Sequence, residues 1–381
     1  MRKAFLFLIT LLLAGFAFPV SAQQASPLVL TLNGDLWAWN GDPAAAPASL
    51  TTWGYNDPAV ISPDGSRIAY TSLAAIVVDA IARGGNQAGG KLPSNVWVID
   101  FSGNGIRVAD QPSNAAFMMP GAADFGIVRS TPAWSPDGNR LVWAEQTYPN
   151  AIDSIVIHDL ASSTTRTIVG NLPPAAGVPA PKDIAWARTG IVVHDVQAGA
   201  NGNLVDLFSV YTPEGMLISS FQVGGGRFMV HWAVMDDNGR EVLGVLFNDA
   251  VWDLFDLNSG TSQTSEGIPE LYSPLNPGGS LALSPVINDV GGFTWRALSP
   301  EGAILAEFVS APYFIPQRYA LSPDGQAVAY SDYLEGQNTF SDQINIWRAG
   351  SITAVPTPVQ FPLLGGIQWA PVSWRVRAGV G

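Results

Sequence analysis

The sequence predicts an all-β fold, a single seven-bladed β-propeller built from four-stranded antiparallel blades. Three observations predict it. A turn motif recurs with a strand pattern on each side, its copies follow one another at a period of about 47 residues, and the residues left at the two ends of the chain together make one further repeat. We therefore expect the N- and C-terminal strands to share one blade and close the ring.

The turn motif is Ser-Pro-Asp-Gly between two apolar segments, and it is clearest at residues 60–70, 133–143 and 320–330. Proline presets φ, aspartate hydrogen-bonds the local backbone and glycine adopts positive φ, so the motif is typical of a tight turn between strands. The aspartates Asp64, Asp137 and Asp324 recur at this position. Their repetition favours a role in the turn over a role as catalytic carboxylates.

One apolar residue before each turn marks one blade, and degenerate copies of the motif complete the set. A recurring third strand, as at 95–100 and 154–159, lies between the markers. We expect the last blade to be shared between about 28–55 and 366–381, and residues 23–381 to form the whole propeller. The seven markers are Ile61, Trp134, Trp186, Met235, Leu275, Leu321 and Trp369.

The motif at 61–70 and 134–143, and more loosely at 321–330, resembles the repeats of the TolB-like (WD-type) β-propeller family. The resemblance extends over nearly all of the chain after the N-terminal segment. TolB itself combines six blades with a separate N-terminal domain, whereas this chain is expected to have seven blades and no such domain. The resemblance therefore implies a propeller fold and not a TolB function.

Residues 1–22 have the features of a secretory signal peptide. Arg2 and Lys3 precede the apolar run 4–18, and a small-residue cleavage site ends at Ala22. The run is shorter than the roughly 20 residues of a membrane-spanning helix, and a retained N-terminal anchor is the alternative. We expect the mature chain to be exported to the periplasm or the extracellular medium, with no membrane insertion after cleavage.

The composition excludes several classes of site and partner. The chain has no cysteine, which excludes disulfides, thiol nucleophiles and cysteine metal sites. Its net charge of −13 disfavours nucleic acid as a partner. The spacing of His158, His194 and His231 does not suit a metal site, and no nucleotide or hydrolase motif is visible. We therefore expect no metal and no cofactor. We also expect a monomer.

One face of the predicted propeller has the long loops. Insertions at 73–94 and 110–130 both connect strands at this face, and the stretch 74–82 predicts a short helix. For the loop side chains, packing over a blade edge is the alternative to binding, and for His231 it is a structural hydrogen bond. The candidate binding residues are Phe117, Met118, Met119, Phe125, His231, Asp332 and Tyr333.

These features favour an exported, non-enzymatic binding scaffold that presents its insertion-rich face to a protein or peptide partner in the cell envelope or outside the cell. The alternative is a propeller hydrolase or lyase acting on a sugar or ester, with a site assembled in the central channel. The residues of such a site come from several blades and are far apart in the sequence, so spacing does not reveal them.

Overall fold

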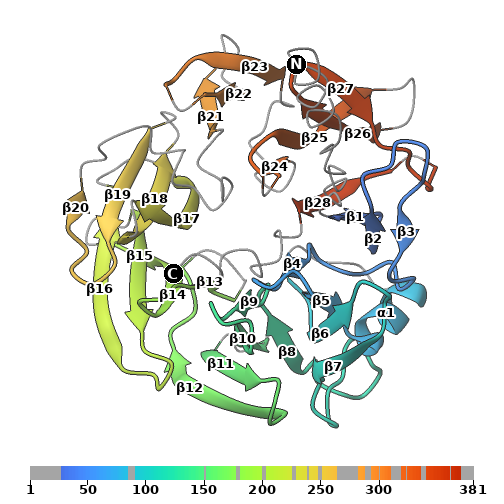
Figure 1. Cartoon of the computed structure of the whole chain (residues 1–381). Coiled ribbons are helices and arrows are strands. Elements are labelled where there is room, and N and C mark those ends of the chain that lie inside the picture. The colour runs from blue at the N-terminus through green and yellow to red at the C-terminus, as the bar shows by residue number, and fades with distance from the viewer. Residues whose placement is uncertain are drawn as a thin grey trace, which may run out of the picture.

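In the computed structural model, the repeated strand segments form small antiparallel sheets arranged as a ring around a common axis (Figure 1). The structure describes residues 27–84, 91–149, 152–176, 181–199, 203–224, 229–237, 240–247, 251–263, 282–287, 293–299, 301–309, 319–322, 324–335, 340–360 and 362–369. The predicted signal peptide lies outside this part of the chain. In the described residues, no helix has the length and apolar character needed to cross a membrane.

The two ends of the described chain share one sheet, as predicted. Its strand order is β28 (Leu364–Trp369), β1 (Leu28–Leu32), β2 (Asp35–Trp39) and β3 (Ala48–Ser49). Leu28 pairs with Trp369 across β1 and β28. All five residues of β1 are buried, because this strand lies between two others and between neighbouring sheets. The N-terminal hairpin therefore completes the blade that the C-terminal strand begins.

The next sheets follow in chain order, each starting with a strand that holds a marker residue. The second sheet consists of β4 (Val60–Ile61), β5 (Arg67–Leu73), β6 (Ser94–Asp100) and β7 (Gly105–Ala109). The third consists of β9 (Ala133–Trp134), β10 (Arg140–Tyr148), β11 (Asp153–Asp159) and β12 (Thr164–Leu172), with β8 (Gly126–Arg129) also paired to β10.

Three further sheets have four strands each. The first contains β13 (Asp183–Trp186), β14 (Ile191–Ala198), β15 (Leu204–Tyr211) and β16 (Leu217–Val223). The second contains β17 (Met229–Asp237), β18 (Arg240–Phe247), β19 (Trp252–Asp256) and β20 (Ser262–Gln263). The third contains β24 (Tyr319–Leu321), β25 (Ala327–Glu335), β26 (Phe340–Arg348) and β27 (Ser351–Ala354).

The predicted number of seven four-stranded blades is wrong, because the described residues form six complete blades. The remaining sheet has three strands, β21 (Ala282–Ile287), β22 (Phe293–Leu298) and β23 (Ile304–Val309). Its marker, Leu275, lies outside the described residues. The turn after Leu275 lacks the serine and aspartate that form hydrogen bonds in the turns after Ile61, Trp134 and Leu321.

The Ser-Pro-Asp-Gly segments form the predicted turns. Ser135 donates to Asp137 at 2.5 Å, the same carboxylate accepts the backbone N–H of Asn139 at 3.0 Å, and Gly138 has a φ of 71°. These hydrogen bonds from Ser135 and Asn139 lower the pKa of Asp137. The aspartate therefore serves the turn, as its repetition in the sequence predicted.

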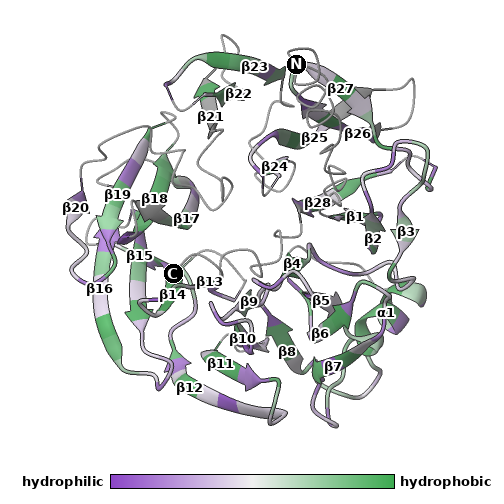
Figure 2. Ribbon diagram, in the orientation of Figure 1, coloured by the Kyte–Doolittle hydropathy of each residue, from purple (hydrophilic) through white to green (hydrophobic). Residues whose placement is uncertain are grey.

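The core lies between neighbouring sheets. Val29 and Leu36 of the first sheet pack with Ile68 and Ile99 of the second, and similar clusters join the later sheets. Figure 2 shows hydrophobic residues along much of β5 and β18, which are middle strands of their blades. The predicted helix is also present as α1 (Ala75–Ala82), between β5 and β6.

Candidate functional site

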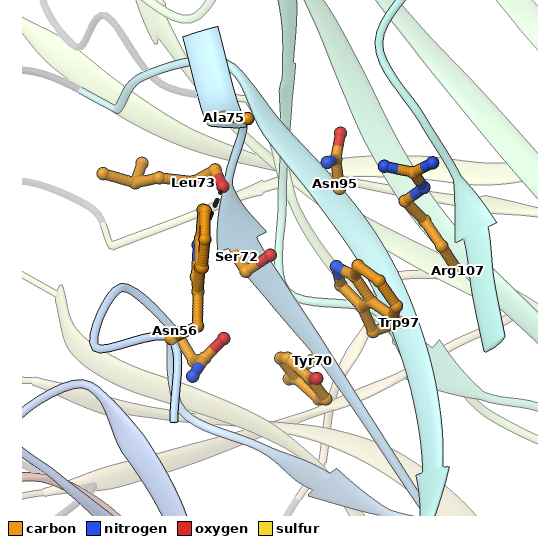
Figure 3. A pocket seen from close by; sticks show the side chains of 9 residues that line it. Asn56, Tyr70, Ser72, Leu73, Ala75, Asn95, Trp97 and Arg107 are labelled. Atoms are coloured by element: carbon orange, nitrogen blue, oxygen red, sulfur yellow. Dashed lines mark hydrogen bonds between the residues drawn. The ribbon is translucent and has the colours of Figure 1, made fainter. Parts of the chain in front are cut away.

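A cavity of about 310 Å³ lies against the second sheet, on the face that packs towards the first sheet (Figure 3). It is bounded by strands β5, β6 and β7, by the start of α1 and by the segment that joins β3 to β4. The residues that line it are Trp53, Asn56, Tyr70, Ser72, Leu73, Ala75, Asn95, Trp97 and Arg107.

Strand alternation explains why these side chains share one face. Tyr70 and Ser72 are two residues apart on β5, and Asn95 and Trp97 are two apart on β6. The register places Ser72 opposite Asn95 and Tyr70 opposite Trp97. Trp97 is in turn opposite Arg107 on β7. Neighbouring side chains in adjacent strands therefore form one continuous lining.

The segment before β4 forms the other wall and is held firmly in place. Asn56 donates from Nδ2 to the carbonyl oxygen of Gly34 at 2.8 Å and to Thr51 Oγ1 at 3.0 Å. Asp35 accepts hydrogen bonds from the backbone N–H of Gly54 at 2.8 Å and from the hydroxyl of Thr51 at 3.0 Å. The amide nitrogen of Asn56 is thus occupied, and Figure 3 shows its oxygen on the side of Ser72.

Aromatic groups supply much of the surface of the cavity. The side chain of Trp53 is 45% exposed, and its indole donates to the carbonyl oxygen of Leu73 at 3.3 Å. The guanidinium of Arg107 lies 5.6 Å from the ring centre of Trp97 and forms an ion pair of 2.8 Å with Asp110. Arg107 therefore reaches the cavity with its charge already paired.

Asn95 is the most informative polar residue of the lining. It is only 5% exposed, and its Oδ1 has no hydrogen-bond partner among the described residues. Burying an amide group without a partner costs about 1–3 kcal/mol in proteins. Because this oxygen is itself buried, the part of Asn95 that faces the cavity is its amide nitrogen, a hydrogen-bond donor (Figure 3).

Tyr70 is a neutral hydrogen-bonding group rather than a base. Burial, together with the nearby carboxylate of Asp35, raises the pKa of Tyr70 to about 12. Among the lining residues only Tyr70 and Arg107 have titratable side chains, and an arginine stays protonated at any physiological pH. The cavity therefore provides groups for binding and no proton acceptor that works near neutral pH.

The predicted binding loop at 110–130 is partly a packing element. Phe117 is buried and packs with Ala74 and Val77 at α1, and its ring centre lies 5.7 Å from that of Tyr148. The side chains of Met118 and Met119 are 46% and 48% exposed. An isolated bridge pairs Ala116 with Phe125. Phe117 thus packs between this loop and α1, whereas the two methionines lie at the surface.

The other predicted binding residues lie on different sheets and do not line this cavity. His231 is on β17 and meets Trp252 edge to face, with ring centres 6.1 Å apart. Burial lowers the pKa of His231 to about 4, so it is neutral at physiological pH. Asp332 and Tyr333 belong to β25, where they pair with Gln343 and Asp342, and their side chains lie outside the described part.

A second polar cluster joins two blades away from the cavity. Lys182 Nζ lies 2.7 Å from Asp195 and 3.4 Å from Asp153, and it donates to the carbonyl oxygen of Pro173 at 2.7 Å. All three charged side chains are buried, and burial raises the pKa of Asp153. In the described part of the chain, no three histidine, aspartate or glutamate side chains are placed to share a metal ion. The cluster is therefore an ion-pair tie between the third and fourth sheets.

Comparison with solved structures supports the propeller fold. The chain resembles an oligogalacturonate lyase in complex with manganese, with a TM-score of 0.51, 10% sequence identity, and 84% of this chain and 83% of that chain covered. It also resembles a periplasmic gluconolactonase of Pseudomonas aeruginosa, with a TM-score of 0.49 and 15% identity over 91% of this chain and 99% of that one.

A third similar structure is the β-propeller domain of the Trilobed protease from Pyrococcus furiosus, with a TM-score of 0.39, 12% identity, and 84% and 96% of the two chains covered. No known family matches the sequence, so the TolB-like resemblance remains a prediction. No curated protein matches it either. At 10% identity the likeness to the lyase shows the fold alone.

The sequence did not predict the cavity, because its lining residues come from four separate segments of the chain. Trp97 belongs to the recurring third strand, yet only part of it is buried. The available signal was Asn95, a polar residue two positions before Trp97 and therefore on the same face of β6. Trp53 has no such signal, because it lies in a connecting segment whose path depends on contacts with Gly34 and Asp35.

Proposed function

We propose that this protein is an exported binding propeller whose cavity beside the second sheet holds a small polar ligand. The observation that carries the proposal is a cavity of about 310 Å³ whose lining combines the aromatic side chains of Trp53, Tyr70 and Trp97 with the uncharged polar side chains of Asn56, Ser72 and Asn95. Ligand pockets are commonly of this size or larger, mostly apolar, and equipped with a few placed polar groups.

The polar groups of the cavity suit recognition better than catalysis. The pKa of Tyr70 at about 12 keeps its hydroxyl protonated, so it can donate and accept hydrogen bonds without exchanging a proton. Ser72 adds a hydroxyl beside Tyr70 on β5, and Asn56 adds an amide oxygen from the segment before β4. These are orienting groups for a neutral ligand.

Export is part of the proposal and depends on the N-terminal segment. Arg2, Lys3, the apolar run 4–18 and the site at Ala22 support secretion of the chain. A fusion of residues 1–22 to a reporter enzyme tests this directly. Reporter activity outside the cytoplasm supports export, whereas activity confined to the cytoplasm contradicts it.

The decisive test of binding uses one substitution that separates ligand affinity from folding. Asn95→Val removes an unpartnered buried amide and places a β-branched residue in a strand, so the unliganded variant should be at least as stable as the parent. A small-molecule library is then screened by thermal unfolding, since a ligand at 100 times its Kd stabilises by about 2.7 kcal/mol.

A compound that raises the Tm of the parent and of a Met118→Ala control, but not that of Asn95→Val, supports the proposal. Met118 is exposed and does not line the cavity. A compound that stabilises all three proteins equally places binding elsewhere and contradicts it.

Two other functions remain as proposals. A protein or peptide partner would use Met118 and Met119, the exposed residues of the 110–130 loop. A hydrolase or lyase is the second, since several proteins of similar fold are enzymes and one of them acts on oligogalacturonate. Affinity capture with and without the 110–130 loop tests for a protein or peptide partner. Turnover of sugar and ester substrates tests for a hydrolase or lyase.

A further inference from the structure

We infer that the ligand of the cavity is a neutral sugar, and that Asp110 sets this preference by occupying Arg107. The inference rests on the proposed function, because it names the ligand class of the same cavity. It is carried by three features of the lining: aromatic surface, uncharged groups that both donate and accept hydrogen bonds, and a cation that is already paired.

The aromatic surface suits a ring with an apolar face. Trp53, Tyr70 and Trp97 all line the cavity, and Trp53 and Trp97 are only partly buried. Figure 3 shows Tyr70 and Trp97 side by side along the same side of the cavity. A pyranose ring presents C–H groups on its faces and hydroxyls around its rim, so it can pack on an aromatic side chain while its hydroxyls reach polar groups.

The hydrogen-bonding groups match hydroxyls and oppose carboxylates. Asn95 has its Oδ1 buried and turns its amide nitrogen, a donor, towards the cavity. Asn56 has its amide nitrogen engaged by Gly34 and Thr51, which leaves its oxygen for the cavity. A hydroxyl can accept from the Asn95 amide and donate to the Asn56 oxygen, whereas a carboxylate has no hydrogen to give.

Arg107 is the one cation of the lining, and its charge is satisfied within the protein. Its Nη2 lies 2.8 Å from Asp110 Oδ2, three residues further along the chain. The guanidinium also lies over Trp97, with its central carbon 5.6 Å from the ring centre. An anionic ligand that reached Arg107 would lie beside the carboxylate of Asp110, on a protein of net charge −13.

Isothermal titration with paired ligands tests the inference. The neutral sugars are glucose, galactose and mannose and their disaccharides, and the matched anions are glucuronate and galacturonate. Glucose differs from glucuronate, and galactose from galacturonate, chiefly at one carboxylate. We expect a neutral sugar to bind, its uronate to bind at least tenfold more weakly, and Asn95→Val to weaken the neutral sugar at least tenfold.

Asp110→Asn provides the second arm, because it releases Arg107 without altering the cavity lining. We expect the ratio of uronate to neutral-sugar affinity to rise at least threefold in this variant. A uronate that binds the parent more tightly than the neutral sugar overturns the inference, and so does an unchanged ratio in Asp110→Asn.

The same titrations separate this inference from the proposed function. If no sugar binds but another small polar compound binds and depends on Asn95, the sugar inference fails and the proposed function stands. If no small molecule shows binding that depends on Asn95, both fail.

Discussion

At the scale of single residues, the serine and aspartate of each turn act as a pair. Ser135 Oγ donates to Asp137 and accepts the backbone N–H of Arg140 at 2.9 Å. We expect Ser135→Ala to lower the free energy of unfolding by about 1–2 kcal/mol, because two hydrogen bonds of the turn are lost. Urea unfolding checks this, with the exposed Ser113→Ala as the control.

The effect of Ser135→Ala should depend on pH with a definite sign. The hydrogen bond from Ser135 is the first cause of the lowered pKa of Asp137. The stability linked to this carboxylate is therefore fully present above its unfolded pKa of about 3.9, and it is lost as the pH falls through the lower folded pKa. The difference in the free energy of unfolding between the parent and Ser135→Ala should therefore shrink below about pH 4. A difference that grows in acid would contradict this assignment.

Lys182 carries a buried charge that holds two buried carboxylates, so its loss should lower the free energy of unfolding strongly. Its removal in Lys182→Met would leave the buried carboxylates of Asp153 and Asp195 without their cation. Breaking a buried pair in this way costs about 3–5 kcal/mol. Arg296→Met is the matched control, because its ion pair with Glu307 is largely exposed and contributes about 1 kcal/mol or less. Equal destabilisation of the two variants would show that the Lys182 cluster is not a tie between sheets.

At the scale of elements, α1 and the loop before β8 stabilise each other through Phe117. We expect Phe117→Ala to destabilise the protein by about 3–5 kcal/mol, as is usual for a buried aromatic residue. Met118→Ala should change stability by about 0.5 kcal/mol or less, because Met118 is exposed. Thermal unfolding of both variants checks this. A Phe117→Ala variant with unchanged stability would contradict this packing role and favour a role for Phe117 in binding.

The elements also show what the sequence could and could not predict. Local turn chemistry at residues 60–70 and 133–143 predicted the strands on each side, because Pro, Asp and Gly act within a few residues of each other. The helix at 75–82 was predicted for a similar local reason. The cavity was not predicted, because it needs the contact of Asn56 with Gly34 and the pairing of β5 with β6. Such contacts depend on tertiary structure.

At the scale of the whole molecule, the pairing of β1 with β28 closes the ring. Ending the chain at residue 363 would remove β28 and leave the buried strand β1 as an open edge. We expect this truncation to lower the Tm and to promote aggregation, since unpaired edges invite strand addition. Size-exclusion chromatography and thermal unfolding check it. A truncated protein that stays monomeric with the parent Tm would contradict closure through this pair.

The most direct measurement of the central claim is a crystal structure of the protein with the tightest-binding sugar from the titrations. We predict electron density for one pyranose ring in the cavity, in contact with Trp97 and with a hydroxyl within hydrogen-bonding distance of the Asn95 amide nitrogen. A sugar found only in the central channel, or at the exposed methionines of the 110–130 loop, would contradict the account.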